Sequence, residues 1–251
     1  MQIVWITALG VGGATVIGAL IGFLFRNVSH RLSDVVLAFA AGVMLAAAVL
    51  GLILPSLEYG GTGGVLVTVL GIFVGALFLH GIDKLIPHLH LLVGVDQDGR
   101  AAEKEKNRIL LFVLAIAIHN LPEGIAAGVG FGSGNQAEAL LLASGIALQN
   151  IPEGMVIIAP MLAAGIPPKK TFFYAAMTGV VEVVGTMIGY FAVSIATAVL
   201  PFALAFAGGT MLYIISDEMI PETHSHGSER AATWSLLVGF CLMLAFDALL
   251  A

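Results

Sequence analysis

Charged residues and thiols are both scarce in this chain. Of its 251 residues only 10% are charged, whereas 59% are hydrophobic, and the mean hydropathy is +1.03. Because soluble domains carry about a quarter charged residues, this composition excludes a soluble globular protein and favours a protein with several membrane spans. The single cysteine, Cys241, excludes both an internal disulfide and a metal site built from several thiolates.

Basic residues are scarce as well. The chain holds ten Lys and Arg against sixteen Asp and Glu, its pI is near 5.5, and it has no basic tract. This balance argues against a nucleic-acid partner. No Lys or Arg precedes the first apolar run, "MQIVWITALG". It therefore lacks the charged start of a signal peptide, and the first helix is expected to be retained.

What the chain has in abundance is long apolar runs. A hydrocarbon core about 30 Å thick is crossed by about 20 apolar residues in a helix. The sequence predicts an all-α polytopic membrane protein, a single domain over residues 1–251 with a cytoplasmic loop at about 91–107. The eight predicted transmembrane helices lie at about 3–25, 34–55, 64–86, 108–130, 138–163, 171–195, 199–221 and 232–250.

The basic residues sort these eight runs into an orientation. They fall in or beside connections 1–2, 3–4, 5–6 and 7–8, and none falls in connections 2–3, 4–5 or 6–7. Positive residues mark cytoplasmic connections, so both termini are predicted to lie outside. The ten residues are Arg26, Arg31, Lys84, Arg100, Lys104, Lys106, Arg108, Lys169, Lys170 and Arg230.

Two hexapeptides repeat in helices of opposite direction. "HNLPEG" spans 119–124 on the fourth predicted helix, and "QNIPEG" spans 149–154 on the fifth. A weaker match, at an offset of 166, aligns the second helix with the seventh and Pro55 with Pro221. The pattern predicts an inverted 3+2+3 repeat, an arrangement typical of transporters with a binding site near the membrane midplane.

Each hexapeptide projects metal-binding side chains to one face of its helix. Residues three and four apart share a helix face. The first motif therefore presents His119, Asn120 and Glu123 together, and the second presents its matching side chains. The prolines remove the helical partners of two backbone carbonyls, and are expected to break both helices beside the site. The second set is Gln149, Asn150 and Glu153, and the two prolines are Pro122 and Pro152.

Three carboxylates lie mid-span without a basic partner. Glu123, Glu153 and Glu182 each cost about 2.5–3.5 kcal/mol to insert into a membrane, and no Lys or Arg lies in the middle of any span. Protons or a bound cation must supply the counter-charge, and one or two divalent ions both satisfy the electrostatics. Imidazole, carboxylate and amide donors suit Zn²⁺, Fe²⁺ or Mn²⁺ better than Cu⁺. Hydrogen bonding between helices and a metal-free proton relay are the alternatives.

A second group of candidate ligands lies near the predicted cytoplasmic helix ends. "HGIDKLIPHLH" and "SDEMIPETHSH" both end inside by the predicted topology. Their side chains can converge at a cytoplasmic mouth and receive the ion as it leaves. The alternative is that they are solvated side chains at helix ends. The exit-side candidates are Asp83, His88, His90, Glu218, His224 and His226.

At these residues the sequence resembles the ZIP (Zrt/Irt-like protein) family of divalent metal transporters, and most closely its bacterial GufA-like branch. The resemblance implies a binuclear midplane site at His119, Asn120, Glu123, Gln149, Asn150, Glu153 and Glu182, with Met44 as a further ligand. Many members carry histidine at the position of Gln149, which puts the second ion in doubt. The resemblance also implies zinc as the main substrate, with cadmium, iron and manganese as others. It implies no prosthetic group, a bacterial inner membrane, inward transport, and a monomer or homodimer.

The function that follows is import of divalent metal through the midplane site. Alternating access, in which the pair of helices 4 and 5 moves against a framework of helices 1–3 and 6–8, suits the inverted repeat. A narrow channel and a structural scaffold are alternatives. A rival class is an intramembrane di-metal enzyme, but the His119-x-x-x-Glu123 spacing is not the Glu-x-x-His pair of di-iron helices. The chain also lacks the H-E-x-x-H protease motif, so no enzyme activity is predicted.

Overall fold

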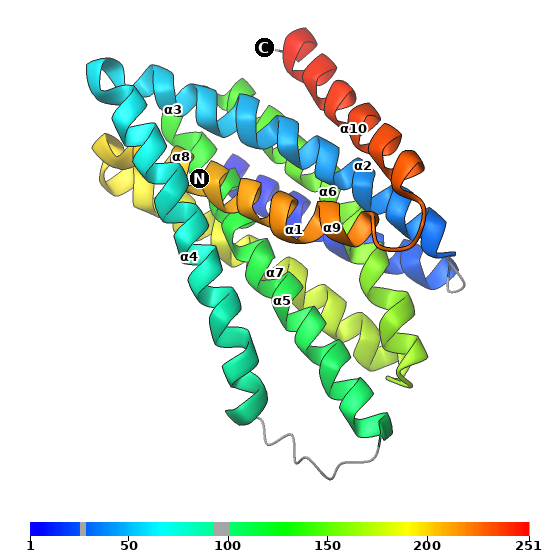
Figure 1. The fold of residues 1–251 in the computed structure, drawn as a ribbon. Helices are drawn as coiled ribbons and strands as arrows, with labels where there is room; N and C mark the ends of the chain where they lie inside the picture. Colours follow the sequence, from blue (N-terminus) through cyan, green and yellow to red (C-terminus); the bar gives the residue numbers. More distant parts are fainter. Residues whose placement is uncertain (26–28, 93–100, 251) are drawn as a thin grey trace.

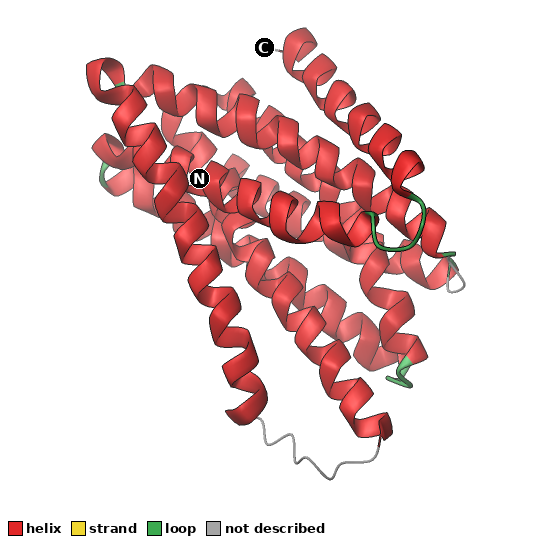
Figure 2. Ribbon diagram, viewed as in Figure 1, coloured by secondary structure: helices red, strands yellow, loops and turns green. Residues whose placement is uncertain are grey.

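The computed structural model describes residues 1–25, 29–92 and 101–250. Only the backbone is described at 83, 85–92, 101–112, 115, 197 and 250. The regular secondary structure of this part is entirely helical, with short loops between helices and no strand (Figure 2). Its α-helices are α1 (Gln2–Leu24), α2 (His30–Ala48), α3 (Leu54–Tyr59), α4 (Gly64–Leu92), α5 (Ala101–Gly130), α6 (Gln136–Ala163), α7 (Pro168–Ile195), α8 (Leu200–Ile214), α9 (Ile220–Thr223) and α10 (Glu229–Leu250). Short 3₁₀ turns are η2 (Gly61–Gly63), η3 (Phe131–Ser133) and η4 (Thr197–Val199), and η1 (Val49–Ile53) and η5 (Ile215–Met219) are π-helical.

Within the described residues, seven helices are long and apolar enough to cross a membrane. This confirms a polytopic helical membrane protein. Helix α5, which has 30 residues and carries the first hexapeptide, is a further long helix beside these seven. The loop predicted at about 91–107 is shorter, because α4 continues to Leu92 and α5 begins at Ala101. Pro201 lies in the first turn of α8, a position that proline favours because its missing N–H has no helical partner there.

Contacts between helix ends separate the connections into two sets. Near one end, Ser56 donates to the Pro201 carbonyl at 2.7 Å, and the Tyr59 hydroxyl donates to Glu138 at 3.4 Å. These contacts join the α3–α4 turn to the start of α8 and the start of α6. The start of α2 contacts the α9–α10 turn through Asp34 and His226. Connections without basic residues therefore share one end.

The long helices pack into two bundles. The first, here called the motif bundle, consists of α1, α5, α6 and α7, with α5 packed on α7 and α1 packed on α6. The second, here called the flanking bundle, consists of α2–α3, α4, α8–α9 and α10, with α2 packed on α10 and α4 packed on α8 (Figure 1). The sequence predicted a division between helices 4 and 5 and the other six. The observed division is different, because α7 packs against α5 and α1 packs against α6.

Glycines bring the backbones of the motif bundle into direct contact. A Cβ atom on Gly124 would lie 2.3 Å from the Glu182 carbonyl oxygen, and one on Gly154 would lie 2.2 Å from the Thr15 carbonyl oxygen. Real Cβ atoms do not approach this closely, so only glycine allows these helices to meet. The two contacts are equivalent: an offset of 30 relates the glycines, and an offset of 167 relates their partners.

The flanking bundle has its own matched pair of backbone contacts. A Cβ atom on Gly75 would lie 2.2 Å from the Phe206 carbonyl oxygen in the α4–α8 pair. In the α2–α10 pair, a Cβ atom on Gly239 would lie 2.2 Å from the Phe39 carbonyl oxygen. The same offset of 167 relates Phe39 to Phe206. Both bundles are therefore held together internally by glycine-to-backbone packing that recurs in the two halves of the chain.

The boundary between the bundles is packed differently. There, a Cβ atom on Gly51 of η1 would meet the side-chain tip of Leu142 at 2.8 Å. One on Gly145 of α6 would meet the Cε atom of Met243, also at 2.8 Å. Among the described glycines, approaches within 3 Å of a backbone atom all lie inside one bundle or one turn. At these two positions of the boundary, flexible side-chain tips lie closest to the glycine, in contrast to the backbone atoms met inside each bundle.

Proline residues act differently from expectation. The prediction that Pro122 and Pro152 break their helices is wrong, since α5 and α6 run through them without interruption. Neighbouring helices and small backbone adjustments accommodate prolines in membrane helices. The irregular segments are instead the π-helices η1 and η5, which are followed by Pro55 and Pro221 and lie at the offset of 166 found in the sequence. Such π-segments occur frequently at functional sites.

Candidate metal centre

The two hexapeptides bury their polar side chains inside the motif bundle. His119, Asn120 and Glu123 of α5 are buried, as are Gln149 and Asn150 of α6. Glu153 is half-buried. One asparagine from each motif, Asn120 of α5 and Asn150 of α6, reaches the same carboxylate on α7. Burial of so many polar groups in an apolar chain is unfavourable unless each finds a partner.

Glu182 of α7 lies at the centre of this polar group and is fully buried. Its Oε1 atom accepts hydrogen bonds from the Thr15 hydroxyl at 2.8 Å and from the Asn120 amide. Its Oε2 atom accepts one from the Asn150 amide at 2.7 Å. The Asn150 amide also donates to the Val11 carbonyl oxygen at 3.2 Å. Helices α1, α5, α6 and α7 are therefore joined through one carboxylate.

Several oxygen acceptors next to this carboxylate have no hydrogen-bond partner. They are Oδ1 of Asn120, Oδ1 of Asn150, Oε2 of Glu123 and Oε1 of Gln149, and each is buried. An unpartnered buried polar atom destabilises a fold by about 1–3 kcal/mol. Carboxylate and amide oxygens are also ligands for divalent cations. The arrangement can therefore hold a cation that relieves the cost of these acceptors.

His119 connects this polar group to the flanking bundle. Its Nε2 atom lies 2.9 Å from Oε1 of Glu218, which belongs to the π-helical segment η5. The Glu218 side chain is 37% exposed, whereas that of His119 is 9% exposed. Thus an acid predicted at the cytoplasmic exit contacts the central histidine directly. The contact therefore links the buried polar group to a partly exposed carboxylate.

The imidazole and carboxylate groups alone do not assemble a complete site. Among the described residues, no three His, Cys, Asp or Glu side chains lie close enough to one another to hold one ion. The unpartnered amide oxygens described above are therefore candidate ligands beside the carboxylates and His119. Met44, the thioether implied by the resemblance, is fully buried in α2 within the apolar core that also contains Met211.

The histidines beyond α9 make contacts other than those expected for exit ligands. His224 pairs with the Ile220 carbonyl oxygen at 2.9 Å and with the Thr233 hydroxyl at 3.2 Å. The His226 Nδ1 atom lies 3.0 Å from Oδ1 of the buried Asp34. In the described part of the chain, neither histidine forms a hydrogen bond with Glu218. The side chains of Asp83, His88 and His90 lie outside the described residues.

Sequence reasoning did not place three residues in the contacts that the structure shows: Thr15, His30 and Asp34. Thr15 is an isolated hydroxyl in an apolar helix, yet it donates to Glu182. The offset of 167 could have revealed it, because this offset aligns it with Glu182. Asp34 lies one helical turn after His30, whose ring stacks on that of His226 at 4.8 Å. The i, i+4 spacing of His30 and Asp34 was the available signal for this group.

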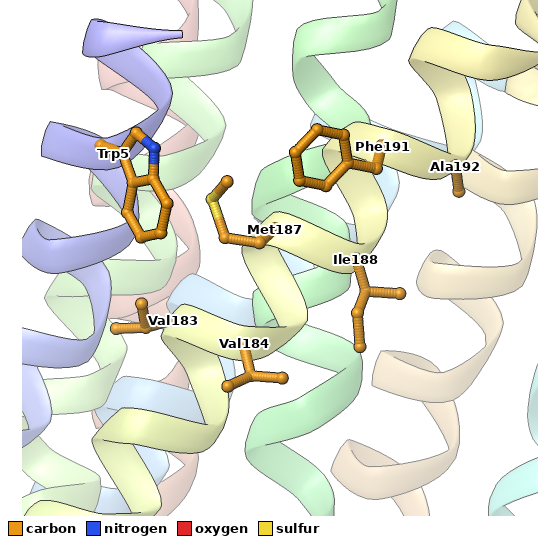
Figure 3. A pocket seen from close by; sticks show the side chains of 7 residues that line it. All are labelled: Trp5, Val183, Val184, Met187, Ile188, Phe191 and Ala192. Atoms are coloured by element: carbon orange, nitrogen blue, oxygen red, sulfur yellow. The ribbon is translucent and has the colours of Figure 1, made fainter.

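A separate cavity of about 630 Å³ lies on the outside of the motif bundle (Figure 3). Its walls are the indole of Trp5 from α1 and aliphatic and aromatic side chains from α7, among them Met187 and Phe191. The lining contains no carboxylate, imidazole or amide side chain. It therefore lacks the donors that a divalent ion needs, and the polar centre around Glu182 remains the candidate metal site.

Comparison with known proteins gives consistent matches over the length of the chain. The family model described as ZIP Zinc transporter matches residues 94–247. Zinc transporter GufA of Myxococcus xanthus is 39% identical over 248 residues, which cover 96% of each chain. Zinc transporter ZIPB of Bordetella bronchiseptica is 40% identical over 93% of this chain and 77% of its own. Zinc transporter ZIP11 of Homo sapiens is 32% identical over 94% of this chain and 93% of its own.

Proposed function

Because the chain belongs to the family of ZIP zinc transporters, we propose that it carries divalent metal ions, chiefly zinc, across a membrane. The observation that carries the proposal is the group of buried, unpartnered oxygen atoms around Glu182. In a membrane interior, these acceptors have no water to replace the missing donors. A transported cation that passes through the motif bundle supplies the missing charge and the missing ligands.

The binding site lies at the level of the two hexapeptides. His119, Glu123 and Glu153 supply an imidazole and two carboxylates, and the two amide pairs of the motifs supply neutral oxygens. This mixture fits Zn²⁺ and admits Cd²⁺, Fe²⁺ and Mn²⁺. Met44 is a further proposed ligand, contributed by the flanking bundle. The three carboxylates Glu123, Glu153 and Glu182 can balance the charge of one or two divalent ions.

The basic connections set the proposed orientation. The described Arg31 and Arg230 flank the end at which Asp34 contacts His226. Positive residues accumulate on the cytoplasmic side, so this end faces the cytoplasm and both termini face outward. Import through the bacterial inner membrane then moves the ion from the Tyr59–Glu138 end toward this end. Glu218 is the first acid on that exit route, and the remaining predicted exit ligands follow it.

Alternating access is the proposed mechanism, with the motif bundle sliding against the flanking bundle. The matched glycine contacts support an inverted repeat, because offsets of 30 and 167 relate contacts in helices of opposite direction. Inverted repeats commonly rock or slide about a site near the midplane. Side-chain tips at the boundary support such sliding, since they can change rotamer without breaking a backbone contact. The His119–Glu218 pair changes partners as the bundles move.

Uptake of radioactive zinc into proteoliposomes tests the proposal. The wild type is expected to load the vesicles, and Glu123→Ala and Glu153→Ala are expected to abolish loading. Glu138→Ala removes an exposed carboxylate from the outer end and serves as the matched control, with uptake close to wild type. If both central variants retain full uptake, the central site is wrong. Competition by Cd²⁺, Fe²⁺ and Mn²⁺ in the same assay ranks the substrates.

The same assay separates transport from the rival function. An intramembrane di-metal enzyme would bind metal in detergent but would not move it across a sealed vesicle. Protons compete with metal for imidazole and carboxylate donors, so zinc uptake is expected to fall as the pH is lowered from about 8 to about 5. Uptake that stays constant over this range would count against metal ligation by these side chains.

A further inference from the structure

A group of metal-binding side chains lies at the end of the flanking bundle where α2 and α10 begin. His226, in the turn between α9 and α10, places its Nδ1 atom 3.0 Å from Oδ1 of Asp34 in α2. The His30 ring stacks on the His226 ring, with the ring centroids 4.8 Å apart and the planes at 21°. Two imidazoles and one carboxylate therefore meet at one place, although they come from segments 192 residues apart in sequence.

Asp34 is the buried member of this group. Its side chain is 4% exposed, and its second oxygen, Oδ2, is buried without a hydrogen-bond partner. In the described part of the chain, neither the exposed Arg31 nor any Lys forms an ion pair with this carboxylate. A buried carboxylate is unfavourable unless charge or hydrogen bonds compensate it. A bound cation would supply the charge that a neutral imidazole lacks.

We propose that His30, Asp34 and His226 form a binding site for a divalent transition-metal ion outside the motif bundle. Imidazole and carboxylate are common zinc ligands, and three protein ligands leave a fourth position for water. The site goes beyond the proposed transport function, because it lies in the flanking bundle and uses no side chain of either hexapeptide. It joins the predicted exit ligand His226 to two residues for which the sequence predicted no role in metal binding.

Helical spacing keeps two of the three ligands together. His30 and Asp34 are four residues apart in α2, so their side chains share one face of the helix. The third ligand, His226, already contacts both of them. The place of the site is thus set by the backbone of α2 and by the α9–α10 turn.

Binding requires rotation of an exposed side chain. The two imidazole rings lie face to face, and in this arrangement the three side chains do not yet surround one point. Both histidines are exposed, His30 in the first turn of α2 and His226 in a turn between helices. Each ring can therefore move to another staggered rotamer and bring a nitrogen atom to the Asp34 carboxylate.

Zinc counting on purified, full-length protein tests the site. The starting protein carries Glu123→Ala and Glu153→Ala, which remove two central carboxylates, and its bound zinc is measured by metal analysis. Adding His30→Ala or Asp34→Asn is expected to weaken one zinc site by more than about 100-fold, since loss of a ligand costs more than loss of an outer partner of a ligand. Glu229→Gln removes an exposed carboxylate at the start of α10 and is the matched control, with an unchanged zinc count.

Cobalt gives a direct readout of residue 30 as a ligand. In a Cys241→Ser background, His30→Cys replaces the imidazole with a thiol, and a thiolate bound to Co²⁺ produces an intense near-ultraviolet band by charge transfer from sulfur to cobalt. This band is expected in His30→Cys. It is expected to be absent in the control Leu32→Cys, whose exposed position lies two residues further on and does not share the face of His30.

The proposal is overturned if His30→Ala and Asp34→Asn bind as much zinc as the starting protein, or if Glu229→Gln loses the same zinc. Absence of the cobalt band in His30→Cys, or an equal band in Leu32→Cys, also overturns it. Because His30 is exposed, its variants test the site even if Asp34→Asn does not fold. Failure of zinc transport would leave this site standing, since the zinc count requires neither uptake nor the central carboxylates.

Discussion

The motif bundle and the flanking bundle are packed internally in one way and against each other in another. Inside each bundle, glycines place helix backbones in contact, as Gly128 of α5 does against the Thr186 carbonyl oxygen, 2.0 Å from a hypothetical Cβ atom. Across the boundary, glycines meet the tips of Leu142 and Met243. In the described part of the chain, the polar contacts that cross it include His119–Glu218 and Tyr59–Glu138.

This difference indicates which parts of the molecule move as units. A glycine-to-backbone contact has no alternative arrangement, because neither side can change rotamer. A leucine or methionine tip has several staggered conformations and methionine adapts easily to a changed surface. The two bundles are therefore expected to remain rigid while the boundary between them rearranges. Four predictions test this difference, from the largest expected effect to the smallest.

A disulfide across the boundary is expected to abolish transport. A Cβ atom on Gly51 would lie 3.5 Å from that of Leu142, within the range of about 3.5–4.5 Å found in disulfides. In a Cys241→Ser background, Gly51→Cys with Leu142→Cys is expected to lose zinc uptake on oxidation and regain it on reduction. The control pair, Gly130→Cys with Ala139→Cys, has a spacing of 3.9 Å inside the motif bundle.

The control pair is expected to transport zinc whether oxidised or reduced, because it joins α5 to α6 within one rigid unit. Equal loss of uptake in both oxidised proteins would contradict sliding along the boundary. Full uptake in the oxidised boundary pair would contradict it as well, once formation of the disulfide has been verified by mass spectrometry.

Adding a methyl group is expected to destabilise a bundle interior far more than the boundary. Gly128→Ala must push α5 away from α7, which costs about 1–3 kcal/mol or more, as overpacking does elsewhere. Gly51→Ala meets only the movable tip of Leu142 and is expected to change stability by less than about 1 kcal/mol. Thermal unfolding in detergent, followed by circular dichroism, compares them. Similar shifts in Tm would contradict the proposed difference in packing.

Loss of the contact between His119 and Glu218 is expected to slow transport without changing the number of bound metal ions. Glu218→Gln removes the charge that receives zinc from His119, and zinc uptake is expected to slow about tenfold, equivalent to about 1.4 kcal/mol in the barrier. Asp217→Asn, at the exposed neighbouring residue of η5, is the matched control and is expected to leave the rate unchanged. A fall in bound zinc with Glu218→Gln would instead make Glu218 part of the resting site.

The outer polar contact is expected to matter least. The hydroxyl of Tyr59 reaches Glu138 at 3.4 Å in an exposed position, so the hydrogen bond is long and competes with water. Tyr59→Phe is expected to change the rate of zinc uptake by less than about twofold, since such a bond contributes about 0.5 kcal/mol or less. A larger change would mean that this contact holds the bundles in one arrangement.

Much of the architecture follows from sequence. Apolar runs predict the membrane helices, and helical spacing predicts that each hexapeptide presents its polar side chains together. Spacing along one helix does not predict partners on another helix. The division into two bundles depended on where glycines meet neighbouring backbones, and the sequence alone does not identify those neighbours. The role of Thr15 was hidden for the same reason, since its meaning comes from Glu182, 167 residues away.

The irregular helices show a second kind of limit. Prolines are visible in sequence, and Pro122 and Pro152 were expected to disrupt their helices, yet α5 and α6 continue through them. The π-segments η1 and η5 carry no local signal apart from the proline that follows each. They are distinguished only by the offset of 166 residues between η1 and η5, which places them at equivalent positions in the two halves of the chain. Long-range repetition was thus more informative than local propensity.

The two halves of the site are chemically unequal, with His119 opposite Gln149 and Glu182 opposite Thr15. For a carrier that moves zinc alone at zero membrane potential, detailed balance requires the ratio of maximal rate to half-saturation concentration to be the same in both directions. Inequality between the halves can make the two half-saturation concentrations differ, and the maximal rates must then differ by the same factor. Such inequality between the halves cannot by itself drive net accumulation of zinc. If the two ratios differ, a second ion must share the cycle with zinc.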